Sequence, residues 1–430
     1  MNSLRGVSAT VRIGVLGCGN VGAAFVDLLN QRRAAIAERT GITLEIAKIA
    51  VRDTSRARGG VPLTDDVRSV VDDPNIDIVV ELMGGIDPAR DVILAALRQG
   101  KPVVTANKEL LAKQGVDMFA AADEAGTDLL FEAAVAGGIP FIRPLRESLR
   151  GEPIRRVMGI VNGTTNFILT KMTEDGADYA AVLAEAQRLG YAEADPTADV
   201  EAFDAAAKCA IIASIAFGAK VVASDVHREG ITLVTPADIA IAERLGYVIK
   251  LLAIAERDGD SGRLAVRVHP AMVPTAHPLA GVRDAYNAVF VEGDAVGSLM
   301  FYGRGAGGNP TASAVLGDVV DAAINLTKKT HAVLGSFALV PFTPIEETSS
   351  EYLISLEVLD QPGVLHAITG VFAANGVSIR TAEQVGINEN ARLVFITHEA
   401  READVQNCLR EFAGLEVVKR SGGFVRVVGA

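Results

Sequence analysis

One segment of the chain gathers carboxylates and a lysine at a spacing suited to binding and reacting with an amine-bearing substrate. It runs from Gly190 through the sequence GYAEADPTAD to Asp204 and Lys208. Residues four apart share one face of a helix, so the helical pattern from 201 onward brings Asp204 and Lys208 together. Such a pair is usually a surface ion pair. Several carboxylates near one lysine could instead hold an ammonium group while the lysine handles a proton.

A glycine motif of the form G-x-G-x-x-G occupies residues 17–22. It follows the apolar run 11–16 directly and precedes the helical pattern 21–39, which is the context of a dinucleotide-binding turn. The glycines permit a tight turn, and the helix N-terminus offers N–H groups to a pyrophosphate. The alternative is a glycine-rich strand-to-helix turn without a ligand.

The end of the next predicted strand, 44–51, bears on the choice between NADP and NAD. NAD sites usually carry an acidic residue there. Here Arg52 precedes Asp53, and Arg56 and Arg58 follow. Guanidinium groups suit a 2′-phosphate, so we expect NADP to be preferred, with NAD as the second cofactor. A solvated basic loop is the alternative.

Strands and helices alternate through the first part of the chain, which predicts a parallel, doubly wound sheet of the Rossmann type. An α+β region with longer helices follows, and residues 336–351, with two prolines, are typical of a linker. The predicted divisions are a nucleotide-binding domain at 1–140, a substrate-binding and dimerisation domain at 141–335, the linker at 336–351 and a regulatory domain at 352–430. The predicted strands are 11–16, 44–51, 76–82, 102–106, 128–132, 155–161, 264–272 and 288–292, and the predicted helices are 21–39, 86–98, 179–189, 202–217 and 311–326.

The last 79 residues show the order βαββαβ, which is the ferredoxin-like arrangement. The segment DQPGVL at 360–365 stands at a strand-to-helix turn and resembles the DxPGvL signature of ACT domains. Gly363 would let the backbone approach a ligand, and the helix that follows would offer N–H groups to a carboxylate. The resemblance implies an amino-acid effector held by Asp360, Gly363, Val364 and Leu365. A dimerisation module without a ligand is the alternative.

Composition excludes several classes of protein. The net charge of −12 makes nonspecific binding to nucleic acid implausible. No apolar run is long enough to span a membrane and no signal core is visible, so no membrane partner is expected. The three cysteines show neither a disulfide framework nor metal spacing, which indicates a reducing cytoplasm, and the six histidines form no zinc-ligand pattern.

Taken together, the motifs resemble those of the homoserine dehydrogenases over nearly the whole length of the chain. Several motifs in the family's order carry the resemblance, and no one of them would suffice. They are GCGNVG at 17–22, ELMGG at 81–85, TANK at 105–108, FEAAVAGGIP at 131–140, NGTTNFIL at 162–169, GYAEADPTAD at 190–199, HPLAGV at 277–282 and GRGAGG at 303–308.

The resemblance implies the interconversion of homoserine and aspartate 4-semialdehyde. It makes Lys208 the general acid/base at the substrate oxygen and places Lys108 beside the nicotinamide. Hydride transfer requires the alcohol proton to leave, and a neutral lysine can accept it. Two nearby lysines disfavour each other's charge, which favours the neutral form of one of them. Without the resemblance, Lys108 could equally be a solvent-facing lysine at a helix start.

The remaining site residues also rest on the resemblance, apart from those of the glycine motif and Arg52, which follow from the residues themselves. The substrate pocket would comprise Gly190, Glu193, Asp199 and Asp204, with Glu193 and Asp204 at the homoserine ammonium or orienting the lysines. The cofactor site would comprise Gly17, Gly19, Asn20, Val21, Gly22, Arg52, Lys108 and Gly305. A Na⁺ or K⁺ site would be formed at Glu132, Val135, Gly137 and Ile139, since backbone carbonyls suit a hard ion. A plain turn with a buried glutamate is the alternative to the ion site.

Two positions depart from the family pattern. Ala194 stands where the family usually has proline, and Ala202 stands where it usually has glycine. Both residues are small, so we expect the pocket to be retained.

The resemblance further implies threonine as an inhibitor and a homodimer or homotetramer, because ACT domains often pair edge to edge. A truncation lacking 352–430 is expected to stay active and to lose sensitivity to threonine. Two other functions stay open on the residues alone. One is a dehydrogenase of another amino acid such as aspartate, and the other is a regulatory binding protein with an inactive catalytic half.

Overall fold

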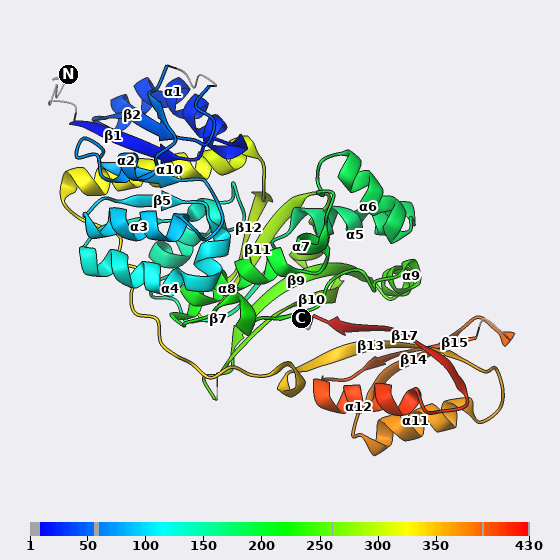
Figure 1. The fold of residues 1–430 in the computed structure, drawn as a ribbon. Coiled ribbons are helices and arrows are strands. Elements are labelled where there is room, and N and C mark those ends of the chain that lie inside the picture. The colour runs from blue at the N-terminus through cyan, green and yellow to red at the C-terminus, as the bar shows by residue number, and fades with distance from the viewer. Residues whose placement is uncertain (1–8, 56–59, 260, 389–390, 429–430) are drawn as a thin grey trace, which may run out of the picture. The chain divides into compact units, whose positions relative to one another are not determined.

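The computed structural model describes residues 9–55, 60–259, 261–388 and 391–428 (Figure 1). It divides into two compact units that each combine segments from distant parts of the chain. The first unit comprises Met1–Val157, Ala207–Val226 and Asn287–Val340. The second comprises Met158–Ala206, His227–Tyr286 and Pro341–Ala430. The architecture is α/β, as predicted.

The first unit contains a parallel sheet of six strands in the order β3-β2-β1-β4-β5-β6. This order places the first strand at the point where the chain reverses its direction of winding, which is where doubly wound folds bind nucleotides. The strands are β1 (Ala9–Leu16), β2 (Ile42–Ala50), β3 (Leu63–Thr64), β4 (Ile78–Glu81), β5 (Val103–Thr105) and β6 (Leu129–Leu130).

Helices cover this sheet, and one of them comes from far along the chain. Helix α10 packs against α1 and contributes Val315 and Val319 to the same apolar core as the central strands (Figure 1). These side chains bury a helix stripe on the sheet, the usual source of helix stability in such folds. The helices are α1 (Asn20–Thr40), α2 (Arg68–Val71), α3 (Ala89–Arg98), α4 (Lys108–Ala125) and α10 (Gly308–Lys328).

The remaining elements before the C-terminal module lie between residues 154 and 304. Strands β7 (Ile154–Ile160), β11 (Tyr286–Gly293) and β12 (Gly297–Arg304) are neighbours in the order β12-β11-β7. In the second unit, β9 and β10 form a long antiparallel hairpin. The other elements of the second unit are α5 (Gly163–Asp175), α6 (Tyr179–Arg188), α7 (Thr197–Val200), β8 (His227–Arg228), α9 (Pro236–Arg244), β9 (Tyr247–Arg257) and β10 (Leu264–Pro274). Helix α8 (Phe203–Phe217) begins in the second unit and continues in the first.

The C-terminal module has the predicted βαββαβ order. Its strand order is β17-β13-β15-β14, and apolar side chains of the strands pack under the two helices on one face. Its elements are β13 (Ser349–Val358), α11 (Val364–Ala374), β14 (Ile379–Val385), β15 (Arg392–Thr397), a short β16 (Ala400–Arg401), α12 (Glu402–Phe412) and β17 (Val418–Val427).

The module is joined to the rest of the second unit by main-chain pairing. Strand β17 runs parallel to β10, with Ala271 opposite Arg426 and Met272 opposite Val427. One edge of the module's sheet is therefore occupied, and β14 forms the other edge.

The observed elements lie close to the predicted ones where the periodicity is strong. The helix predicted at 21–39 is Asn20–Thr40, and the strand predicted at 155–161 is Ile154–Ile160. Helix α4 and strand β9 were not predicted. None of the helices among the described residues has both the length and the apolar character required to cross a bilayer.

Candidate functional site

The glycine turn at 17–22 has the shape that a bound dinucleotide requires. Gly17 has a φ of +92°, and a Cβ there would lie 2.7 Å from the Leu82 carbonyl. A Cβ on Gly22 would lie 2.5 Å from the Gly17 carbonyl oxygen. Gly19 caps α1 without a side-chain hydrogen bond, and the space beside it is open. The first-turn N–H groups of α1 are thus left for a ligand such as pyrophosphate.

The end of β2 lies against this turn. The Gly17 N–H donates to the Ala50 carbonyl at 2.9 Å. Arg52 follows two residues later and is exposed, while the Asp53 carboxylate accepts hydrogen bonds from Ser55. Arg56 and Arg58, the other basic residues of the predicted phosphate loop, lie outside the described residues.

A buried carboxylate organises the two loops that follow β4 and β5. Glu81 is fully buried and accepts from the N–H groups of Met83 and Gly84 at 2.8 and 3.0 Å and from the Thr105 hydroxyl at 2.6 Å. Its motif was noticed in the sequence, but no role was predicted for the residue. The sequence feature that could have pointed to it is a lone carboxylate at the end of an apolar strand. Burial of such a group without a hydrogen-bond partner would be costly, so partners nearby could have been expected.

Lys108 owes its position to the residue before it. Asn107 caps α4 by accepting from the Leu110 N–H at 3.1 Å, and it donates to the Gly85 carbonyl at 2.6 Å. Lys108 is then the first residue of α4 and is exposed. A cation at a helix N-terminus opposes the helix dipole, so Lys108 is not explained by the stability of α4.

The glycine loop at 303–308 joins two predicted sites within the first unit. Gly305 is buried, and a Cβ on it would lie 2.0 Å from the Asn287 amide. A Cβ on Gly137 would lie 2.3 Å from the Gly305 carbonyl oxygen, so the two backbones are in contact. Gly308 lies beside Asn20 at the start of α1. The predicted cofactor residue Gly305 is thus positioned between the glycine turn and the predicted ion loop.

The predicted ion loop folds around the carboxylate of Glu132. That carboxylate accepts from the N–H groups of Phe141, Ile142 and Arg143 at 2.5, 2.6 and 2.8 Å. It is fully engaged with the main chain, so an ion in this loop would be held by backbone carbonyls. The described residues contain no group of three His, Cys, Asp or Glu side chains able to hold a metal ion.

The loop's backbone is unusually tight and buried. Ala136 and Gly137 have φ values of +57° and +53°, and Val135 and Ile139 are buried beside them. Asp318 accepts from the Glu132 N–H at 2.8 Å, and burial, reinforced by the charge of Glu132, raises its pKa to about 7. A left-handed alanine costs about 1 kcal/mol, so the turn is maintained against local strain.

Asn162 brings together the two aspartates of the substrate segment. Its Nδ2 donates to Asp199 Oδ1 at 2.7 Å and to Asp204 Oδ2 at 2.9 Å. Its Oδ1 accepts from the Thr165 N–H at 2.9 Å and thereby caps α5. Sequence reasoning quoted this asparagine only as part of a motif. The sequence pattern that could have identified it is Asn-x-x-Thr directly after a buried strand, which is typical of a helix N-cap.

Asp204 lies in the first turn of α8, and Lys208 follows one turn later on the same helix. Both side chains are at least nine-tenths buried. The alternative of a surface ion pair therefore does not hold for these two residues. A buried aspartate and lysine must be paired or hydrogen-bonded, which is typical of a functional site.

The turn between α6 and α7 carries the other predicted pocket residues. Gly190 follows the C-cap of α6 and is in the left-handed region with a φ of +78°. The Thr164 hydroxyl donates to the Tyr191 carbonyl at 2.6 Å. Glu193 lies in an exposed stretch, and its carbonyl accepts from the Gln187 amide at 3.0 Å. The segment is thus anchored by its backbone, which leaves the Glu193 side chain accessible to a ligand.

Ala202 explains one departure from the family pattern. It is fully buried with a φ of +63°, a conformation that glycine adopts without strain. The alanine keeps the turn that places Asp204 at the start of α8, at a cost of about 1 kcal/mol.

The sequence of this chain matches known protein families over most of its length. Residues 17–132 match the family model described as "Homoserine dehydrogenase, NAD binding domain", 140–320 the one described as "Homoserine dehydrogenase", and 352–416 the ACT domain. The chain is 48% identical to homoserine dehydrogenase of Corynebacterium glutamicum, over 99% of this chain and 97% of that protein. It is 50% identical to homoserine dehydrogenase of Mycobacterium tuberculosis, over 97% and 98%. This chain belongs to the homoserine dehydrogenase family.

A solved structure supports the same assignment. The homoserine dehydrogenase of Thiobacillus denitrificans matches with a TM-score of 0.92 and 42% identity, covering 97% of this chain and 98% of that one. The expected family, the α/β fold with an ACT domain and the oxidoreductase activity of homoserine dehydrogenase are confirmed. The first unit accordingly contains a domain that binds a nicotinamide nucleotide.

The ACT domain of this chain holds a pocket at the predicted effector turn. The pocket has a volume of about 330 Å³, and Asp360, Gly363, Val364 and Leu365 all line it, together with residues of β14. The Asp360 carboxylate fixes the neighbouring loop by accepting from the Gln384 amide and the Asn388 N–H. The predicted effector residues therefore lie around one cavity at the open edge of the sheet.

A buried arginine links the ACT domain to the substrate segment. Arg426 of β17 donates to both oxygens of Glu402 and of Glu229 at 2.7–2.8 Å. Burial raises the pKa of Glu229, but hydrogen bonds from His227 and Arg426 outweigh it and hold that pKa well below its ordinary value. Two residues on, the Ile231 N–H donates to the carbonyl of Val200, which is the neighbour of Asp199.

Proposed function

We propose that the protein interconverts L-homoserine and L-aspartate 4-semialdehyde with NAD(P), with NADP preferred. The observation that carries the proposal is the Asn162 amide, which holds Asp199 and Asp204 together one turn before Lys208. Paired carboxylates attract the substrate ammonium, and a buried lysine on the same helix supplies a group able to exchange a proton. Glu193 and the Gly190 turn complete the substrate pocket.

Within this proposal, Lys208 takes the proton from the homoserine hydroxyl during oxidation and returns it during reduction. Lys108 lies at the nicotinamide end, where its cationic form stabilises developing negative charge on the substrate oxygen. A bound nicotinamide supplies or accepts the hydride. Gly17, Gly19, Asn20, Val21, Gly22 and Gly305 hold the dinucleotide.

The test is the variant Lys208→Met, measured in homoserine oxidation and in aspartate semialdehyde reduction. We expect turnover to fall by about 10² to 10⁴, the usual contribution of a positioned acid/base, with cofactor affinity retained. Lys171→Met, which alters an ion pair of α5, is the matched control. Unchanged turnover in Lys208→Met would falsify the proposed role. Faster turnover with aspartate than with homoserine would instead favour an aspartate dehydrogenase.

Preference for NADP rests on Arg52, which follows the strand end that contacts the glycine turn. A related solved structure, 27% identical over 75% of this chain, is described as a hyperthermophilic archaeal homoserine dehydrogenase in complex with NADPH. A guanidinium at this place suits the 2′-phosphate that distinguishes NADPH from NADH.

The loop at Glu132, Val135, Gly137 and Ile139 is proposed to bind Na⁺ or K⁺ through its carbonyls. The engagement of the Glu132 carboxylate with three N–H groups supports a purely main-chain site. Its contact with Gly305 supports a structural role beside the cofactor. Replacement of both ions by N-methylglucamine is expected to lower the melting temperature, and an unchanged melting temperature would contradict the site.

The ACT pocket is proposed to bind threonine, which would inhibit the enzyme. A truncation at 352 is a poor test, because it would remove Arg426, the partner of Glu229, and would uncover the edge of β10. Leu365→Trp in the full chain fills the pocket instead, and Leu365 is half exposed. We expect the inhibitory threonine concentration to rise at least tenfold while uninhibited activity is kept. Leu339→Trp, at an exposed site elsewhere, is the control.

A homodimer or homotetramer is proposed from the same sheet. One edge is occupied by β10, so pairing between chains would use β14. Unpaired sheet edges readily accept another strand. Size determination of the full chain in solution tests this, and a monomer at micromolar concentration would contradict it.

A further inference from the structure

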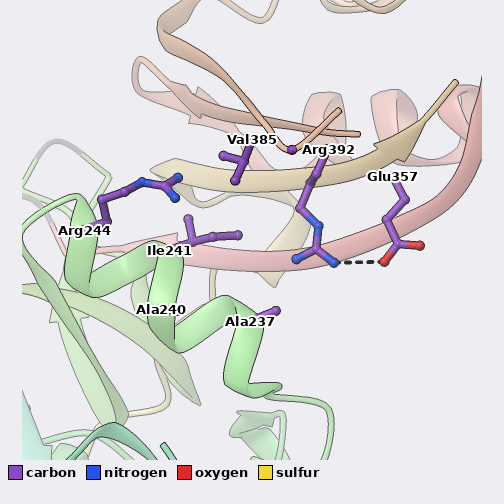
Figure 2. A pocket seen from close by; sticks show the side chains of 8 residues that line it. Ala237, Ala240, Ile241, Arg244, Glu357, Val385 and Arg392 are labelled. Carbon is purple, nitrogen blue, oxygen red and sulfur yellow. Dashed lines mark hydrogen bonds and ion pairs between the residues drawn. The ribbon is translucent and has the colours of Figure 1, made fainter. Parts of the chain in front are cut away.

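A second pocket, of about 360 Å³, lies between helix α9 and the sheet of the ACT domain (Figure 2). Both walls belong to the second unit. The helix wall is formed by Ala237, Ala240, Ile241 and Arg244. Their spacing of three and four residues places them along one helix face, so α9 presents a short apolar stripe that ends in a guanidinium group.

The sheet wall is a row of side chains in register. Val385 of β14 stands opposite Arg392 of β15, which stands opposite Glu357 of β13, which stands opposite Arg420 of β17. Because alternate residues of β13 and β15 belong to the core under α11 and α12, this row lies on the other face of the sheet. Of the row, Val385, Arg392 and Glu357 line the pocket.

The charges around the pocket favour an anion. Oε1 of Glu357 accepts from both Arg392, at 2.9 Å, and Arg420, at 2.7 Å, so two cations share one carboxylate oxygen. Arg244 donates to Glu383 at 3.0 Å. Within the part of the chain that the structure describes, Arg244 and Arg392 each make one hydrogen bond, through Nη2. A guanidinium has five N–H donors, so several remain for a ligand.

The apolar groups define the rest of the ligand. Figure 2 shows the guanidinium groups of Arg244 and Arg392 and the side chains of Ile241 and Val385 directed into the space between helix and sheet. Guanidinium groups bind carboxylates with matched geometry, while branched and methyl side chains bind alkyl groups through burial. The volume admits a molecule of a few carbon atoms.

We propose that this pocket is a binding site for a small aliphatic carboxylate. The carboxylate lies against Arg392 and Arg244, and the alkyl group lies against Ile241 and Val385. The site is distinct from the effector pocket at 358–365, and it goes beyond the proposed function because it depends on neither catalysis nor threonine. A ligand here would contact both α9 and the ACT sheet and would strengthen their association.

The test uses isovalerate as the probe and saturation-transfer NMR from the full chain to its methyl groups. Isovaleramide and isobutylamine have the same branched end without the carboxylate. We expect isovalerate to bind and the other two to bind at least tenfold more weakly, since the charge-assisted hydrogen bonds are lost. Equal binding of isovalerate and isovaleramide would overturn the proposal.

Substitutions in the pocket test whether isovalerate binds there. Arg392→Gln and Ala240→Phe are each expected to weaken isovalerate at least tenfold, the first by removing a donor and the second by filling the space. Arg420→Gln is the control for Arg392→Gln, because Arg420 binds the same Glu357 oxygen without lining the pocket. The affinity of the Arg420→Gln variant for isovalerate should stay within about threefold of the wild-type value. If Leu365→Trp abolished binding while Arg392→Gln and Ala240→Phe did not, the probe would lie in the effector pocket and the proposal would be wrong.

Discussion

Asn162 donates to Asp204 at 2.9 Å across 42 residues of sequence, and the same nitrogen donates to Asp199 at 2.7 Å. A single amide thereby fixes the distance between two carboxylates that would otherwise repel each other. Because Asn162 also caps α5, the position of the two aspartates depends on the start of that helix.

Asn162→Ala is therefore expected to act on substrate binding. Loss of the shared donor leaves two carboxylates without their common partner, so KM for homoserine should rise at least tenfold, with a smaller fall in kcat. Asn162→Ser keeps a capping oxygen and should recover the roughly 1 kcal/mol of stability that the cap contributes. The KM of this variant for homoserine should stay as high as that of Asn162→Ala. A change in stability alone, with KM unchanged, would show that Asn162 only caps the helix.

Arg426→Met should destabilise the protein by about 3 to 5 kcal/mol, because it leaves the fully buried Glu402, and the partly exposed Glu229 beside it, without their cation. Urea unfolding measures this. Arg420→Met, which removes a largely exposed arginine from Glu357, should cost far less, because a solvent-exposed ion pair contributes little to stability. Since Ile231 binds the carbonyl beside Asp199, Arg426→Met is also expected to raise KM for homoserine. Equal costs in the two variants would contradict the buried network.

Arg52→Ala should weaken NADP and leave NAD nearly unchanged. Loss of one charge-assisted phosphate contact corresponds to about tenfold in affinity. The measurement is KM for both cofactors in aspartate semialdehyde reduction. Arg68→Ala, an exposed arginine on α2, is the control. An unchanged ratio of NADP to NAD affinity would remove Arg52 from the phosphate site.

Ala202→Gly and Ala205→Gly should differ although both remove a buried methyl group. Ala202 is in the left-handed region, so glycine relieves strain there, whereas Ala205 lies in the right-handed α8. Ala205→Gly is expected to cost at least about 1 kcal/mol more, by thermal or urea unfolding. Similar costs would mean that Ala202 is not strained.

Lys250 is expected to make the free energy of unfolding of the protein depend on pH. Burial lowers its pKa to about 8, and its Nζ donates to the Asn166 side chain and the Val282 carbonyl. A base whose pKa is lower in the folded state binds fewer protons there than when unfolded. Its stabilising contribution therefore rises as the pH climbs from about 8 toward 10.5.

The comparison is with Lys250→Met, which does not titrate. Between pH 7.5 and 9.5 the stability of the wild type relative to this variant should increase by about 2 kcal/mol. A difference that stays constant with pH, measured by urea unfolding, would show that Lys250 keeps its ordinary pKa.

Much of this molecule follows from local sequence. The alternation of apolar strands with helical patterns predicted the parallel sheet, and the glycine spacing at 17–22 predicted the turn, because each depends on interactions between residues close in sequence. The βαββαβ order of the last domain was predictable for the same reason. The ordered set of family motifs identified the substrate segment, although spacing alone left Asp204 and Lys208 as a surface ion pair.

Tertiary structure decided what those local elements do together. Periodicity places residues on a face, but it does not say which face meets which, so the sequence did not predict that α10 packs against α1 or that β17 pairs with β10. Asn162, Glu81 and Arg426 are polar residues whose partners lie far along the chain. Their roles depend on burial, where an unpaired polar group is costly, and burial exists only once distant segments have packed.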